Sequence, residues 1–238
     1  MQQINVADYT IDVEKKDIKN LHLAVYPPHG RIRIAVPKEL DDESIRLHIV
    51  SKLSWIKKQI AKFETAERLS NKDYITGESH YLEGKRYLLD VISGANINRI
   101  RLRGKTHIEL HEKPGTPHAH RHIMFQEWYR IRLKVRVQPL MDKWQEIIGV
   151  QINEWTVKQM KTKWGTCNTK AKRIWINLEL AKKPDDCLEY IVVHELVHLI
   201  EKHHNERFKA LMDKYLPDWR QRKEKLNKLP LSYEEWGE

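Results

Sequence analysis

Residues 194–198 read His-Glu-Leu-Val-His, and two histidines in this spacing around a glutamate are typical of metal-dependent hydrolases. Positions four residues apart share one face of a helix, so His194 and His198 could each bring an imidazole nitrogen to one Zn²⁺. Glu195 would then stand beside the metal, where it could act as the general base that takes a proton from the attacking water. The pattern therefore predicts a zinc-dependent hydrolytic site on a helix.

A catalytic zinc takes three protein ligands and keeps one position for water, so the motif needs a third ligand. His203 and His204 follow it closely. On an unbroken helix His204 would face away from His198, because six residues turn the chain by about 600°. We therefore expect the helix to end near Glu201, so that the chain can turn back. The residues alone leave His203 and His204 open as the third ligand, with Glu206 as a less favoured substitute.

The motif has two other interpretations. Residues 194–198 could be part of a buried helix whose histidines have ordinary hydrogen-bond partners, but burying two imidazoles and a carboxylate among apolar residues is costly without a metal. A structural zinc is the second alternative. Such sites favour four ligands rich in cysteine, and the nearest upstream cysteine is Cys187. Both alternatives are less favoured than a catalytic zinc.

The elements that must position this site follow from apolar periodicity, which predicts an α+β fold. A hairpin is expected over 21–25 and 32–36, and a long helix over 41–69, with Asp41 or Asp42 as its N-cap. Pro139 should kink or break the second long helix. The remaining predicted elements are short strands within 74–92 and 99–111, a turn at 112–117, a helix over 118–148, strands at 151–159 and 173–178, and helices at 185–200, 205–215 and 220–228.

The predicted turn at 112–117 divides the chain. We expect an N-terminal α+β module over residues 1–112 and a hydrolase domain over 118–238, built on the helix that carries His194. A single compact unit is the alternative.

Length and composition favour a soluble globular protein. The chain has 238 residues, of which 40% are hydrophobic and 32% charged, and no apolar run approaches the roughly 18 residues that a membrane span needs. The N-terminus lacks the basic start and apolar centre of a secretory signal. Only Cys167 and Cys187 are present, too few for a disulfide framework. We expect a cytoplasmic protein with no membrane partner.

Positive charge is concentrated in the middle of the chain. Residues 95–175 carry 17 basic and 6 acidic side chains, a net charge of +11, whereas residues 1–94 carry +1 and residues 176–238 carry −2. Such a segment attracts anions, and it could contact nucleic acid, a nucleotide or an acidic protein. A set of solvated helix faces explains the same charge equally well.

Further segments support the hydrolase interpretation through a family resemblance. Trp-Gly-Thr-Cys at 164–167, Ile-Trp-Ile-Asn-Leu-Glu-Leu at 174–180, Tyr-Ile-Val-Val-His-Glu-Leu-Val-His-Leu-Ile at 190–200, His-Asn-Glu-Arg-Phe at 204–208 and Leu-Pro-Asp-Trp at 216–219 occur in order. Together they resemble the YgjP-like metallopeptidase-type family of predicted zinc-dependent hydrolases, over about residues 140–222.

The resemblance implies a zincin-like core of the gluzincin or SprT type. It also implies that His194, His198 and His204 are the zinc ligands and that Glu195 is the catalytic base. Thr166 stands where the family pattern has serine, and His203 beside His204 leaves the identity of the third ligand open.

Three neighbouring features were considered as parts of the site. The Trp-Gly-Thr-Cys segment could be a turn beside the cleft, although packing of its tryptophan and cysteine in a core is favoured. Asn177 could orient the substrate or a ligand histidine, and Tyr190, one helical turn before His194, could reach the site. Ordinary structural roles for both are at least as common.

These observations predict a zinc-dependent hydrolase that most resembles a metallopeptidase acting on a peptide or protein. The alternatives are hydrolysis of a nucleoside triphosphate, an anionic substrate, at the same site, or a protease associated with nucleic acid through the basic 95–175 segment. The sequence does not indicate an oligomeric state.

Overall fold

The computed structural model of the chain describes residues 2–26, 30–65, 72–160 and 163–229. Contacts divide the chain into two compact units, the first ending at residue 70 and the second spanning Asn71–Leu229. Each unit combines strands with helices around an apolar core of its own. The predicted α+β class is confirmed.

The first unit is a four-stranded sheet followed by two helices. Its elements are β1 (Gln2–Val6), β2 (Tyr9–Lys16), β3 (His22–Tyr26), β4 (Arg31–Pro37), α1 (Asp42–Ser51) and α2 (Leu53–Thr65). The strand order is β1-β2-β4-β3, with β2 and β4 parallel and the other pairs antiparallel. Ile34 and Val36 alternate along β4 and share one buried cluster with Ile45 and Ile49 of α1. The antiparallel pairing of β3 and β4 confirms the predicted hairpin, although residues 27–29 of its turn lie outside the described residues.

The single helix predicted over 41–69 is two helices. Asp41 caps the first, as one of the two predicted N-caps, and its carboxylate accepts a hydrogen bond from the Ser44 N–H at 2.8 Å. At Lys52, with φ −106° and ψ 2°, the backbone leaves helical geometry and α1 ends. The part of the prediction beyond Thr65 falls on residues 66–69, outside the described residues.

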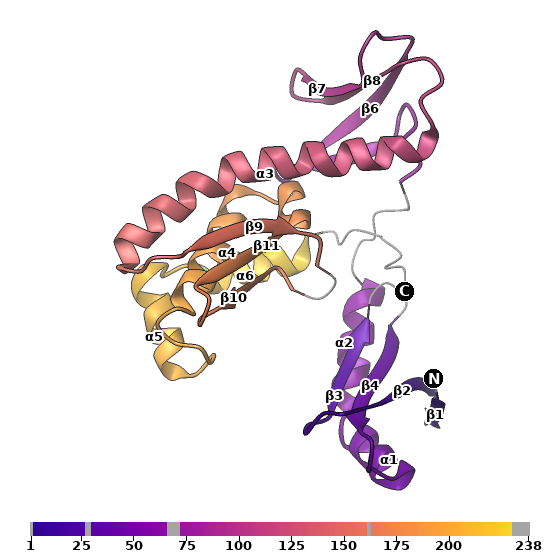
Figure 1. Ribbon diagram of the computed structural model, residues 1–238, viewed down its shortest axis with the longest axis vertical. Helices are drawn as coiled ribbons and strands as arrows, with labels where there is room; N and C mark the ends of the chain where they lie inside the picture. Colours follow the sequence, from indigo (N-terminus) through magenta and orange to yellow (C-terminus); the bar gives the residue numbers. More distant parts are fainter. Residues whose placement is uncertain (1, 27–29, 66–71, 161–162, 230–238) are drawn as a thin grey trace. The chain divides into compact units, whose positions relative to one another are not determined.

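The second unit contains two sheets joined by a long helix, α3 (Figure 1). Its elements are β5 (Ser79–Leu82), β6 (Lys85–Ser93), β7 (Arg99–Arg103), β8 (His107–Glu112), α3 (His118–Ile148), β9 (Glu154–Lys158), β10 (Gly165–Asn168), β11 (Arg173–Asn177), the 3-10 helix η1 (Leu178–Lys182), α4 (Asp185–Val197), α5 (Glu206–Tyr215) and α6 (Trp219–Lys228). The strand orders are β5-β6-β8-β7 and β10-β11-β9. In the second sheet β10 is an edge strand, paired antiparallel to β11.

Helix α3 matches its predicted range of 118–148. Its buried residues recur every three or four positions, the spacing of one helix face. They are Phe125, Tyr129, Leu133, Val137, Met141, Trp144 and Ile148. Of the predicted kink or break at Pro139, a break is wrong, since the helix runs through this residue. Proline has no backbone N–H, so Pro139 cannot donate to the carbonyl of Val135, four residues before it. Both residues lie on the exposed face of α3, and the buried residues of the opposite face continue without interruption.

The units of the structure divide the chain earlier than the boundary drawn at 112–117. Leu89, Ile108 and Leu110 of the first sheet in the second unit share one buried cluster with Phe125 and Leu133 of α3. Strands β5 to β8 therefore pack with the elements that follow them.

The arginines of the basic segment 95–175 are mostly ion-paired. Seven of its eight arginines lie within salt-bridge distance of a carboxylate, namely Arg101, Arg103, Arg121, Arg130, Arg132, Arg136 and Arg173. Four carboxylates that pair with the segment lie outside it, namely Glu83, Asp90, Asp185 and, paired with Lys143, Glu189. Folding thus offsets part of the segment's charge locally. Among the described residues, no helix is long and apolar enough to cross a membrane.

Candidate metal centre

Helix α4 presents the motif at its C-terminal end. Its residues from Tyr190 to Val193 are buried, and His194 and Glu195 lie in the last turn. The helix ends at Val197 with His198 as its C-cap, three residues earlier than the predicted end at residue 200. After Val197 the backbone hydrogen bonds change from the α-helical to the 3-10 type. The N–H groups of residues 199 and 200 donate to the carbonyls three residues before them, at 3.0 and 2.9 Å.

The chain then turns back toward α4. His198 donates from Nδ1 to the backbone carbonyl of Glu201 at 3.1 Å, which ties the turn to the last residue of the motif. Asn205 caps α5, since its side-chain oxygen accepts from the Phe208 N–H at 3.0 Å. Between these two anchors His204 returns to the face of α4 that carries His194.

The structure brings together three imidazoles, those of His194, His198 and His204. One ring nitrogen from each lies within 4.8 Å of a ring nitrogen of each of the other two. The Nε2 atoms of His194 and His204 are 3.0 Å apart, close to the roughly 3.4 Å expected between two ligands that are 2.0–2.1 Å from one tetrahedral zinc. His203 is exposed, and its backbone N–H donates to the Glu201 carboxylate. Of the two candidates, the structure places His204 beside His194 and His198.

The three imidazoles have the charge state that a metal requires. Burial lowers the pKa of His194 to about 3, helped by repulsion from the other two rings, and burial also lowers the pKa of His198 and of His204. All three are therefore neutral near pH 7. Because His198 donates through Nδ1, its Nε2 keeps a free lone pair. Three neutral imidazoles around one point fit Zn²⁺ as a donor set.

Glu195 stands beside this cluster and is only 4% exposed. Burial raises the pKa of its carboxyl group to about 8, against the weaker effect of the positive charge of Lys163. In the metal-free chain the group is therefore poised to exchange a proton near neutral pH, the range in which a general base works best. A bound cation would favour its ionised form.

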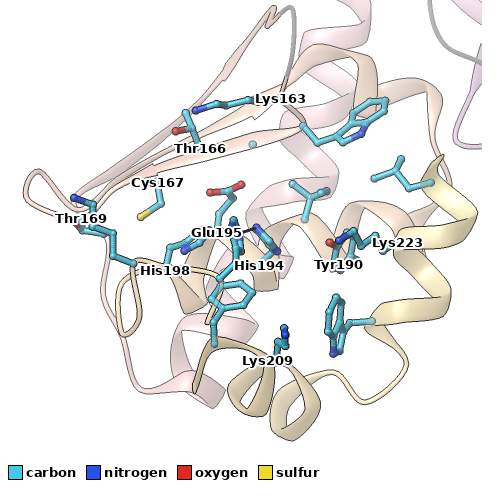
Figure 2. Close-up of a pocket in the computed structure, with 18 of the residues that line it drawn as sticks. Lys163, Thr166, Cys167, Thr169, Tyr190, His194, Glu195, His198, Lys209 and Lys223 are labelled. Carbon is cyan, nitrogen blue, oxygen red and sulfur yellow. Dashed lines mark hydrogen bonds between the residues drawn. The ribbon is translucent and has the colours of Figure 1, made fainter. Parts of the chain in front are cut away.

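A pocket of about 660 Å³ opens over these residues (Figure 2). Strand β10 forms one wall, and helices α4, α5 and α6 form the others. Figure 2 shows the Glu195 carboxylate on the β10 side of the histidines, with Lys163 on that side of the pocket and Lys209 and Lys223 on the helical side.

Of the neighbouring residues that the sequence pointed to, some line the pocket and one does not. The segment 164–167 was expected as a turn beside the cleft or as a hairpin with core side chains. It forms Trp164 and the edge strand β10, which is one arm of the β10-β11 hairpin. Trp164 and Cys167 are half-buried, and both pack against the core and line the pocket. Tyr190 lines the pocket too. Asn177 does not; it is buried behind β10 and donates to the backbone carbonyls of Met160 and Lys163. Burial raises the pKa of the Cys167 thiol to about 11, so it is a neutral group and a poor nucleophile near pH 7.

Two groups of residues at the pocket are not predicted by the sequence motifs. Phe208 is buried beneath all three histidines, with ring centroids 4.8 to 4.9 Å from theirs. Its place four residues after His204, on the apolar face of a predicted helix, was the available signal. Lys202, Lys209 and Lys223 also line the pocket, although all three lie outside the basic 95–175 segment of the sequence.

A comparison with protein families identifies the family of the chain. The family model for the YgjP-like metallopeptidase domain matches residues 19–229, almost nine-tenths of the chain. The chain belongs to the YgjP-like metallopeptidase family. This membership confirms the resemblance drawn from the sequence motifs.

Two solved structures are similar to part of this YgjP-like chain. The metallopeptidase zymogen abylysin of Pyrococcus abyssi matches with 20% identity and a TM-score of 0.36, over 40% of this chain and 99% of that one. The metallopeptidase zymogen jannalysin of Methanocaldococcus jannaschii matches with 21% identity and a TM-score of 0.34, over 38% and 86%. A comparison with curated proteins finds no match.

Proposed function

We propose that this YgjP-like protein is a zinc-dependent hydrolase that cleaves peptide bonds, with His194, His198 and His204 as the zinc ligands. One observation carries the proposal. Three neutral imidazoles converge beside a buried carboxylate, that of Glu195, at the wall of a pocket large enough for several residues of substrate. Membership of a metallopeptidase family supports the same reaction class.

The residues divide the chemistry between them. A zinc ion held by the three histidines would supply Lewis acidity to the scissile carbonyl and activate water. Glu195 takes a proton from the attacking water and delivers it to the leaving nitrogen, for which its buried position and raised pKa are suited. Water is the nucleophile in this scheme, because Cys167 is the cysteine that lines the pocket and its thiol stays protonated.

Strand β10 supports a peptide substrate. It is the edge of the β10-β11-β9 sheet, and Gly165, Thr166 and Cys167 all line the pocket. An edge strand offers backbone N–H and C=O groups to an extended chain, which can add as a further strand. A peptide bound in this way would run past Glu195 and the histidines.

The charges around the pocket favour a second candidate, hydrolysis of a phosphoanhydride such as a nucleoside triphosphate. Lys163, Lys202 and Lys223 line the pocket, and no carboxylate other than that of Glu195 lies among its described lining residues. A second cavity of about 370 Å³, which shares Lys202 with the first, adds Lys170 and Arg173. Positive charge of this kind raises the local concentration of anionic substrates.

The test combines metal analysis with two substrate classes. Wild type should hold about one zinc per chain and hydrolyse casein, and His194→Ala and His204→Ala should each lose the metal. Glu195→Gln should keep the zinc and lose at least roughly 100-fold in turnover. Glu146→Gln, which changes an exposed carboxylate on α3 that does not line the pocket, is the matched control and should match wild type.

The outcomes separate the candidates. Hydrolysis of nucleoside triphosphates but not casein, lost in Glu195→Gln, would move the assignment to the phosphoanhydride. Full turnover in Glu195→Gln would refute Glu195 as the base. A folded wild type that holds no metal and takes up no added zinc would overturn the whole proposal.

A further inference from the structure

Gly165 lies where strand β10 passes the side chain of Glu195. A Cβ atom added at Gly165 would be 2.5 Å from Oε1 of Glu195, 2.7 Å from its Cγ and 2.8 Å from its Cδ. Such distances are far inside the roughly 3.5–4.0 Å of a normal contact. The φ angle of Gly165 is not in the left-handed region. The glycine is therefore required here for room beside the carboxylate.

Glu195 has little freedom to yield to a larger residue. Its side chain is 4% exposed, and the close approaches involve the stem atom Cγ as well as the carboxylate. Rotating the carboxylate alone would relieve the contact with Oε1 but not the one with Cγ. An added methyl group must move the whole side chain or move the strand.

The strand is held from behind by Asn177. Gly165 pairs with Ile176 in the β10-β11 ladder, and the Asn177 backbone N–H donates to the carbonyl of Trp164 at 2.9 Å. The buried amide of Asn177 donates to the carbonyls of Met160 at 2.9 Å and Lys163 at 2.7 Å. Its side-chain oxygen accepts from the Glu179 N–H at 3.1 Å, so the whole side-chain amide acts on this segment or on the start of η1.

We propose that Gly165 and Asn177 are positioning residues for Glu195. Asn177 fixes the backbone that enters β10, and the bare backbone of Gly165 then sets where the carboxylate of Glu195 stands relative to the three histidines. The role of Glu195 as the base rests on the proposed function, whereas the packing between Gly165 and Glu195 is tested without it.

The first experiment measures turnover and metal content in Gly165→Ala. A displacement of about 1 Å at a catalytic group can cost about 100-fold in rate, so kcat should fall by about that factor. KM should stay within about threefold, and the zinc content should be unchanged because the three atoms nearest to the new methyl group all belong to Glu195 and none to a histidine. A kcat within about threefold of wild type in the folded variant would overturn the proposal.

Asn177→Asp provides a second variant in case Gly165→Ala does not fold. It keeps the oxygen that accepts from Glu179 and removes both donors to the segment before β10, so kcat should fall at least about tenfold with zinc retained. Asn153→Asp is the matched control. It removes a similar bond, from an exposed side-chain amide to the carbonyl of Ala171, and should leave kcat unchanged. Equal losses in the two variants would refute a specific role for Asn177.

A thermal double-mutant cycle tests the packing alone. Gly165→Ala should lower Tm by several degrees in wild type and by much less in a Glu195→Ala background, where the atoms nearest to the methyl group are gone. The same loss of Tm in both backgrounds would show that Gly165 serves the strand and not Glu195. This cycle gives its answer even if the protein hydrolyses neither casein nor a nucleotide.

Discussion

Replacing Phe208 by alanine tests how the zinc site is held in shape. The Phe208 side chain is 2% exposed, and its ring centroid lies 4.9 Å from that of His194, 4.8 Å from that of His198 and 4.8 Å from that of His204. One apolar ring thus packs against all three proposed ligands. Its removal should loosen the orientation of every imidazole at once, in addition to leaving a cavity.

The magnitude has two parts. A buried phenylalanine replaced by alanine costs about 3–5 kcal/mol of unfolding free energy. Residues that orient metal ligands are typically worth about 10- to 100-fold in metal affinity. Because zinc that binds only the folded chain stabilises it by RT ln(1 + [Zn]/Kd), a Kd weakened by this factor reduces the zinc-induced gain by about 1.4–2.7 kcal/mol at equal saturating zinc.

The assay is chemical unfolding of the metal-free and zinc-loaded protein, together with a competition titration for zinc. Met212→Ala is the matched control, since Met212 is fully buried one turn further along α5 and does not line the pocket. It should lose about 2–5 kcal/mol of stability and keep the wild-type gain on adding zinc. A folded Phe208→Ala variant with the wild-type zinc affinity would refute the reasoning, as would an equal loss of affinity in Met212→Ala.

Two further predictions concern ion pairs and charge. Burial raises the pKa of Glu189, but hydrogen bonds from Lys143, Arg222 and Trp144 outweigh this effect and hold the pKa at about 2. The stabilisation from the ionised carboxylate is therefore present above about pH 4.5 and lost as the pH falls toward 2, so the difference in unfolding free energy between wild type and Glu189→Gln should disappear over that range. A difference that does not change with pH would contradict the assignment. Contact between nucleic acid and the lysines of the basic 95–175 segment predicts that the association constant for duplex DNA falls steeply between 50 and 200 mM salt. Binding that does not change with salt would exclude an electrostatic contact.

The local part of the site could be predicted from the sequence because it depends on helix geometry alone. Residues four apart on one helix must share a face, so the pairing of His194 with His198, and Glu195 beside them, needed no knowledge of the fold. The apolar period likewise predicted α3 at its observed bounds, and Asp41 as a cap. It failed at Lys52, where one predicted helix became two, since a single residue that leaves helical geometry has little effect on a periodic pattern.

The tertiary structure decided which residues join that local pattern. The choice of His204 over His203 depends on the path of the turn between α4 and α5, in which both histidines are equally close in sequence. The sequence also contained no sign that Gly165 faces Glu195, because the two lie thirty positions apart and meet only once β10 packs beside α4. The net charge of residues 95–175 was plain from composition, yet folding pairs most of its arginines with carboxylates, some of them from outside the segment. Sequence spacing determines contacts within one helix, whereas contacts between elements depend on how the chain returns, and that is set by the packing of the whole core.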